Sequence, residues 1–141
     1  MTTRADFIAT VRSYIGTPYV HQGRRPGVGM DCPAPIILAG RAHGLLPHDF
    51  DVNGYDPMPD GKTLLAWCDR YMRRVSNPEP GDVIVVHFKG GRPQHLGVLT
   101  DNTPDRSYWV HADGLVYKEV RETRLDFGSR AMRLVAAFSL L

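Results

Sequence analysis

Apolar residues follow a helical period in the first half of the chain and form β-branched runs in the second half. The first half predicts three helices, over residues 3–15, 36–43 and 62–75. Thr3 is placed to cap the first helix, because Asp6 follows it in the capping-box position. The apolar face of this first helix is formed by Phe7, Ile8, Val11 and Ile15.

The second half of the sequence is typical of strands joined by tight turns. Five strands are predicted, over residues 83–88, 96–100, 107–112, 115–120 and 132–141. Asp113-Gly114 separates the third strand from the fourth and predicts a hairpin turn, and a loop is expected over 90–93. Helices followed by strands indicate an α+β fold, in which the N-terminal helices pack on a mostly antiparallel sheet of about five strands.

Composition and charge narrow the classes of function. The 141 residues suit one domain over 1–141, and 43% hydrophobic with 23% charged residues is ordinary for a globular protein. A net charge of +2 gives no support for nucleic-acid binding, and the scattered arginines indicate a solvated surface. The first residues show neither a signal peptide nor a membrane span, so synthesis in the cytoplasm is expected, with export only by another vehicle.

The two cysteines stand in different surroundings. Cys68 lies on the apolar face of the helix predicted over 62–75, where a free cysteine usually acts as a small buried hydrophobe. Cys32 follows a glycine-rich stretch at a junction between loop and helix, where backbone N–H groups favour a thiolate. A nucleophilic thiolate needs a basic partner, and His95 and His111 lie on later predicted strands. The alternative is that Cys32 is a second buried structural cysteine.

The remaining histidines carry no recognisable chemistry. His87 lies in a predicted strand, and His21, His43 and His48 lie in loops or at a helix end. Their spacing matches no metal site, and we expect neither a metal nor a cofactor.

Five short motifs occur in a fixed order along most of the chain. They are Gly-Thr-Pro-Tyr at 16–19, Asp-Cys at 31–32, Pro-Gly-Asp-Val at 80–83, His-Leu-Gly-Val at 95–98 and His-Ala at 111–112. In this order the sequence resembles the NlpC-type cysteine peptidases, papain-like enzymes that hydrolyse the peptide stems of bacterial cell wall. The resemblance implies a papain-like single domain that acts on peptidoglycan.

The same resemblance implies a role for each matching residue. Cys32 would be the nucleophile, His95 the base and then the acid, and His111 the residue that orients His95. Tyr19 would help to bind the substrate carbonyl, and Asp31 would bind a substrate amine. Each has a structural alternative: an edge-strand histidine for His95, a hairpin residue for His111, a packed loop aromatic for Tyr19 and a helix cap for Asp31.

The sequence departs from the family pattern directly after the cysteine. The family usually has a small residue and then glycine, whereas this chain has Pro33, Ala34 and Pro35. Proline has no N–H, so two donors are lost from the turn that should stabilise the thiolate. Pro35 also disfavours helical backbone angles at Ala34, so a start of the helix at Pro35, with Cys32 a few residues outside it, is an alternative. The hypothesis that follows is a weakened or specialised nucleophile.

Two further segments resemble the branch of this family found in phage tails and phage-like gene transfer particles. They are His-Gln-Gly-Arg at 21–24 and Arg-Leu-Val-Ala-Ala-Phe at 133–138. This resemblance implies a tail component that cuts peptidoglycan during envelope penetration, with tail-tip or hub proteins as partners. Two alternatives stay open: a structural or plug component with little catalysis, and another thiol-dependent acyl transfer, such as deamidation or lipid acylation.

Overall fold

The first helix, α1 (Arg4–Arg12), begins at the predicted capping box. In the computed structural model, which describes residues 1–57, 60–88, 94–126 and 132–141, the Asp6 N–H donates to the Thr3 hydroxyl and the Thr3 N–H to the Asp6 carboxylate. The helix ends three residues before the predicted boundary, and Gly16 turns the chain with a φ of +93°. Ile15, predicted on the buried face, is 42% exposed because it lies beyond the helix.

The two other helices differ from their predicted bounds. Helix α2 spans Ala34–Ala42, and two short strands, β1 (Arg24–Arg25) and β2 (Gly29–Met30), form a hairpin before it. Helix α3 spans Thr63–Tyr71. The prediction of helix up to residue 75 was wrong, because Met72 is extended and β3 (Arg73–Val75) pairs with the last strand of the chain.

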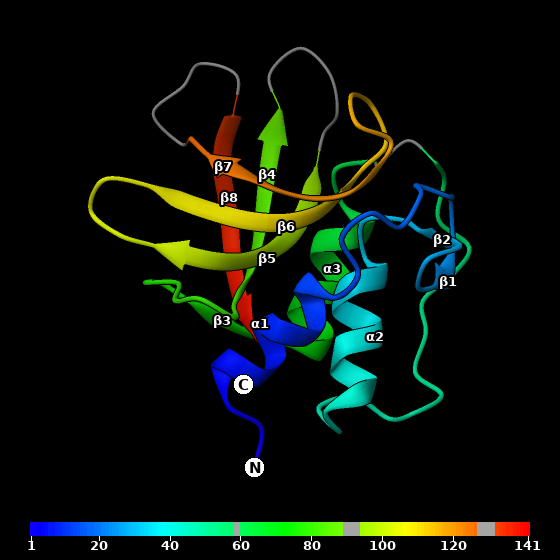
Figure 1. Cartoon of the computed structure of the whole chain (residues 1–141), viewed down its shortest axis with the longest axis horizontal. Coiled ribbons are helices and arrows are strands. Elements are labelled where there is room, and N and C mark those ends of the chain that lie inside the picture. Colours follow the sequence, from blue (N-terminus) through cyan, green and yellow to red (C-terminus); the bar gives the residue numbers. More distant parts are fainter. Residues whose placement is uncertain (58–59, 89–93, 127–131) are drawn as a thin grey trace.

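The α+β fold predicted from the sequence is confirmed. Within the described residues, a six-stranded antiparallel sheet has the order β3-β8-β4-β5-β6-β7 (Figure 1). The sequence predicted five strands, and the additional strand of this sheet is β3. The loop predicted over residues 90–93 lies outside the described residues. The longer strands are β4 (Val83–Phe88), β5 (His95–Asn102), β6 (Ser107–Asp113), β7 (Glu119–Leu125) and β8 (Met132–Ser139).

The connection between β6 and β7 is wider than a two-residue turn. The Asp113 carboxylate accepts the N–H groups of Leu115, Val116 and Tyr117, which organises a loop over residues 114–118. Pairing therefore starts at Asp113 with Glu119. The predicted strand over 115–120 was wrong in position, because the aspartate side chain stabilises the longer loop instead of a tight turn.

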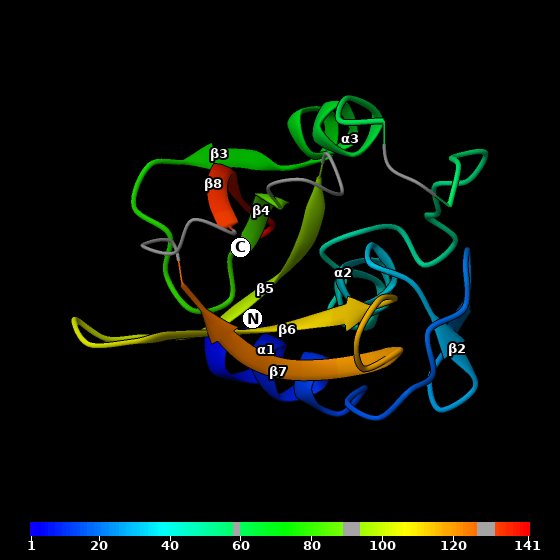
Figure 2. The same cartoon turned by 90° about the horizontal axis from the view of Figure 1, so that it is seen from above.

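The sheet is buried on both faces around β4. The helices lie on one face, where α1 contacts β5 and α2 contacts both β5 and β6 (Figure 2). Val83 and Val85 join the core beneath the helices, whereas Ile84 and Val86 pack on the opposite face with Trp109. Alternation along one strand thus fills two apolar clusters, which fixes the register of β4 and β5 and with it the position of His95.

Cys68 is 3% exposed in the core, and burial raises the pKa of its thiol to about 12, so its predicted role as a buried hydrophobe is confirmed. Each helix of the described part has nine residues. A bilayer-spanning helix needs about 20 apolar residues, so none of these helices is long and apolar enough to cross a membrane.

Candidate active site

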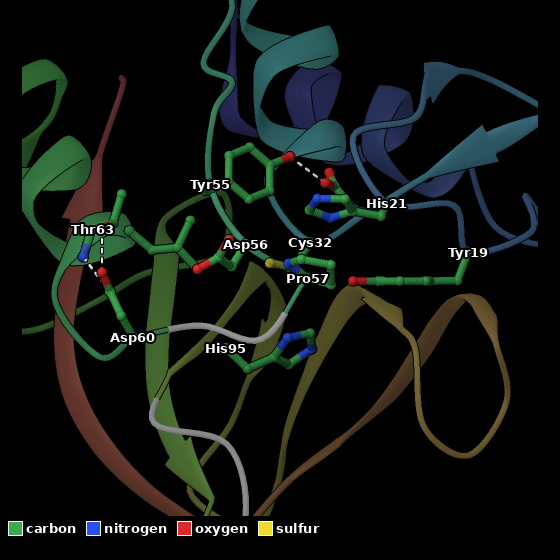
Figure 3. A pocket seen from close by; sticks show the side chains of 11 residues that line it. Tyr19, His21, Cys32, Tyr55, Asp56, Pro57, Asp60, Thr63 and His95 are labelled. Carbon is green, nitrogen blue, oxygen red and sulfur yellow. Dashed lines mark hydrogen bonds between the residues drawn. The ribbon is translucent and has the colours of Figure 1, made fainter.

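A pocket of about 500 Å³, counted to include the solvent at its mouth, opens beside Cys32. Figure 3 shows the Cys32 sulfur, the His95 ring and the Tyr19 hydroxyl pointing into it from three different segments. Four of the five residues predicted for the site therefore line one pocket. The full lining is Tyr19, His21, Asp31, Cys32, Tyr55, Asp56, Pro57, Asp60, Thr63, Leu64 and His95.

Cys32 lies two residues before α2 and is 8% exposed. Pro33 occupies the N-cap with helical angles, φ −78° and ψ −17°, and Pro35 lies in the first turn. The first turn of a helix has no intrahelical use for its N–H groups, so Pro35 is tolerated there. Helix α2 therefore begins at Ala34, one residue before the start at Pro35 that the two prolines suggested and two before the predicted start at residue 36.

The turn around Cys32 nevertheless offers few N–H groups to an anion. Pro33 and Pro35 have none, and the Ala34 N–H donates to the Asp31 carbonyl oxygen at 3.2 Å. No side chain caps the helix. The loss of donors expected from the sequence is therefore present in the structure.

His95 is the first residue of β5 and is 5% exposed. Its ring packs against Phe88, at a centroid distance of 5.7 Å, and against Trp109, which meets it edge-on at 5.4 Å. Packing against these two aromatic rings restricts the rotation of the imidazole. An imidazole held in this way keeps one orientation toward the pocket.

His111, in β6, lies behind His95 and does not line the pocket. Its Nδ1 is 2.9 Å from the Nε2 of His95, and its own Nε2 is 2.8 Å from the Thr123 hydroxyl. Burial lowers the pKa of His111 to about 4, although Asp113 opposes this shift. His111 is thus neutral near pH 7, with one ring nitrogen as donor and the other as acceptor. Thr123, on β7, was not found from the sequence.

Tyr19 is held in place by backbone contacts and by a close glycine. Its N–H donates to the Lys118 carbonyl oxygen at 2.9 Å, which ties it to the β6–β7 loop. A Cβ atom at Gly114 would lie 3.0 Å from the Tyr19 ring. Glycine at 114 therefore allows the loop to pack directly against this tyrosine.

Asp31, next to Cys32, is buried with a side-chain exposure of 1%. Its carboxylate accepts from the Arg24 guanidinium at 2.7 Å, from the Gln22 N–H at 2.7 Å and from the Tyr55 hydroxyl. Burial and the Asp31 hydrogen bond raise the pKa of Tyr55, so Tyr55 remains a neutral donor. Arg24 and Tyr55 were not predicted as site residues. Arg24 had a sequence signal, because it ends the motif at 21–24. Tyr55 had none, because it lies in a segment predicted to be a loop.

The described residues contain no group of three or more His, Cys, Asp or Glu side chains arranged to hold a metal ion. The site contains a thiol beside a helix start, a buried imidazole that lines the same pocket and a second imidazole within hydrogen-bond distance of the first. This set of groups suits nucleophilic catalysis, in which a base activates a thiol and a third residue orients the base.

No family model matches the sequence, and no curated protein matches it. Solved structures do match. The NlpC/p60 domain of the peptidoglycan hydrolase SagA is 20% identical, with a TM-score of 0.60 over 98% of this chain and 99% of that chain. Ly7917 is 17% identical with a TM-score of 0.59, and its structure with the hydrolysing product of MDP is 13% identical with a TM-score of 0.61.

These likenesses establish that the chain has the fold of an NlpC/p60 domain. The alignment covers 98% of this chain and 62% of the Ly7917 chain, so this chain spans less than two thirds of the Ly7917 chain. At such low identities the comparison shows the fold alone.

Proposed function

We propose that this chain is a cysteine peptidase that hydrolyses an amide bond in the peptide stems of peptidoglycan. The observation that carries the proposal is the pocket that Cys32 and His95 both line, with His95 hydrogen-bonded to the neutral His111 at 2.9 Å. The similarity of the fold to the domain of a peptidoglycan hydrolase supports the choice of substrate.

In the first half of the reaction, Cys32 attacks the substrate carbonyl carbon and forms a thioester. The Nε2 of His95 is engaged by His111, so Nδ1 is the nitrogen that accepts the thiol proton. When the C–N bond breaks, the protonated His95 returns that proton to the leaving amine. His95 Nε2–H donates to His111 Nδ1, and the neutral His111 donates its own Nε2–H to the Thr123 hydroxyl, so His111 orients the His95 ring without adding charge.

In the second half, water replaces the amine. His95 takes a proton from the water, the resulting hydroxide attacks the thioester carbon, and the C–S bond breaks. The proton returns to the Cys32 sulfur, and the new carboxyl group leaves the pocket. The Cys32 N–H and the Tyr19 hydroxyl are proposed to bind the oxyanion in both halves, and Asp31 to bind a substrate amine.

The prolines after Cys32 favour one second candidate. With Pro33 and Pro35 lacking N–H groups and the Ala34 N–H already used, the thiolate receives little help from α2. The second candidate is therefore a structural or plug component of a tail tip, which keeps the fold but has little catalytic activity. Such a component would not need backbone N–H groups to stabilise a thiolate.

For its setting, we propose incorporation in a phage-like tail, with tail-tip or hub proteins as partners. The support is the resemblance of residues 21–24 and 133–138 to the tail branch of the family. Affinity purification from producing cells tests this: copurification with tail proteins supports it, and recovery only as an isolated cytosolic protein contradicts it.

The chemistry is tested first by alkylation of Cys32 against pH in a Cys68→Ala background, with and without His95→Ala. The expected result is rapid alkylation at neutral pH that slows toward the behaviour of an ordinary thiol, with a pKa of about 8.5, when His95 is removed. A sluggish thiol indifferent to His95 would favour the structural candidate.

The substrate is tested separately by mass spectrometry of purified peptidoglycan after incubation with the protein. New amine and carboxyl ends in the stem peptides are expected with the wild type and none with Cys32→Ser. An activated thiol that leaves the wall intact would contradict the substrate and point to another acyl transfer.

A further inference from the structure

Arg24, in β1, uses all of its hydrogen-bond donors. A guanidinium has five N–H groups in a rigid plane, and each has a protein acceptor here. Nε donates to the Asp51 carboxylate at 2.9 Å, and one terminal nitrogen donates to the Asp31 carboxylate at 2.7 Å and the Gly23 carbonyl at 2.9 Å. The other donates to the Val52 carbonyl at 3.1 Å and the Tyr55 hydroxyl at 2.8 Å.

These contacts join two parts of the pocket that are far apart in the sequence. Asp31 precedes the nucleophile, whereas the segment 51–55 leads directly into Asp56 and Pro57, which form part of the pocket wall. Tyr55 closes the connection: its hydroxyl accepts from Arg24 and donates to Asp31. The wall is thereby bonded to the residue beside Cys32.

The Tyr55 ring is also packed on the side of the pocket. It meets His21 edge-on at 5.2 Å and Trp67 edge-on at 5.4 Å. The hydrogen bonds of Arg24 fix the position of the Tyr55 hydroxyl, and the two aromatic contacts fix the plane of its ring.

The Asp31 carboxylate is nearly saturated by this arrangement. A carboxylate has about four lone-pair sites, and Arg24, Tyr55 and the Gln22 N–H fill three of them. One acceptor site is left, and its direction is set by the other three bonds. The negative charge of Asp31, beside Cys32, is neutralised by the ion pair with Arg24, whose side chain is only 13% exposed.

We propose that Arg24 is a positioning residue of the candidate active site. Its guanidinium fixes the 51–57 segment as a wall of the substrate pocket and orients Asp31, with the Tyr55 hydroxyl as the link between them. The effect of Arg24 on substrate binding rests on the proposed function. Its effect on the position of the 51–57 segment rests on the five hydrogen bonds alone.

Lysine cannot replace arginine at this position. An ammonium group preserves the charge opposite Asp31, but its donors radiate from one atom and cannot reach Asp51, Val52 and Tyr55 together. Arg24→Lys therefore separates geometry from charge. Tyr55→Phe removes only the hydroxyl and retains the packed ring, so it provides a second variant that is expected to fold.

Arg12→Lys is a matched control. Arg12 also makes a two-nitrogen ion pair, with Glu122, but it lies in α1 and does not line the pocket. A general loss of stability caused by any arginine-to-lysine change would appear in this variant too.

The first measurement is hydrogen exchange of the 51–57 segment, which needs no substrate. Exchange is expected to be about tenfold faster in Arg24→Lys and Tyr55→Phe, the factor for losing one charge-assisted hydrogen bond. It should stay at the wild-type rate in Arg12→Lys. Equal rates in all four proteins would overturn the inference.

The second measurement is the kinetics of stem-peptide cleavage together with alkylation of Cys32. Arg24→Lys is expected to raise KM about tenfold and to leave the alkylation rate within about twofold, because the charge next to Asp31 is retained. An unchanged KM, or a fall in kcat alone, would overturn the inference. Absence of cleavage by the wild type would refute the proposed function, while hydrogen exchange would still decide whether Arg24 holds the wall.

Discussion

The Nε2 atom of His95 lies 2.9 Å from the Nδ1 atom of His111, which ties the start of β5 to β6 behind the pocket. The two strands are neighbours in the sheet, and Trp109 stacks on the His111 ring at 4.6 Å. The sheet therefore positions both imidazoles before any substrate binds, and the proposed base needs no rearrangement to face Cys32.

The low pKa of His111 predicts a dependence of stability on pH. Its pKa is about 4 in the folded protein and 6.5 in the reference state, so between these values the unfolded chain binds more protons. The free energy of unfolding should therefore fall as the pH falls from about 6.5 to 4, by at most about 3 kcal/mol from this residue.

Urea unfolding of wild type and His111→Asn at pH 7, 5.5 and 4 measures this contribution. The wild type should lose more stability than the variant across this range, since only the wild type gains a buried charge when it is protonated. Parallel losses in the two proteins would contradict the prediction.

Thr123 is predicted to assist the reaction through His111. Thr123→Val removes the hydroxyl that lies 2.8 Å from His111 Nε2, and kcat/KM should fall by up to about tenfold, the net value of one hydrogen bond. Thr123→Ser retains the hydroxyl and should restore most of the activity. Equal losses in the two variants would mean that packing, and not the hydroxyl, is what matters.

The two prolines after Cys32 are predicted to limit its reactivity. Pro33→Ser with Pro35→Leu returns two N–H groups to the start of α2 and adds a side chain that can cap it. Alkylation of Cys32 at pH 7 should become about two- to fivefold faster, as expected for an anion near a helix N-terminus. Pro47→Ser, beyond the other end of α2, is the control, and an unchanged rate in the double variant would refute the hypothesis.

Gly114 is predicted to be required for the position of Tyr19. In Gly114→Ala the new methyl group meets the half-buried ring at 3.0 Å and displaces it by a few tenths of an ångström, so the free energy of unfolding should fall by about 1 kcal/mol, the lower end for overpacked sites. In a Tyr19→Ala background the same change should cost little, because the ring is gone. A double-mutant cycle measured by urea unfolding tests this coupling, and additive effects would contradict it.

The sequence determined the features that depend on neighbouring residues. The capping box of Thr3 and Asp6 was predictable because its partners are three residues apart, and the switch from helices to strands because each element carries its own period. Burial of Cys68 followed from its place on an apolar helical face. The motifs around Tyr19, Asp31, Cys32 and His95 were also sufficient to predict four residues that line one pocket.

Only the tertiary structure decided the features that depend on distant partners. Strand β3 exists because three residues pair with β8, more than 60 positions away. Thr123 reaches His111 because Asp113 stabilises a five-residue loop and so sets the register of β7. Arg24 and Tyr55 bond across Asp31 from segments without any periodic pattern. Hydrogen bonds between such segments follow no period along the sequence, so the patterns that predict helices and strands do not predict which polar residues will meet.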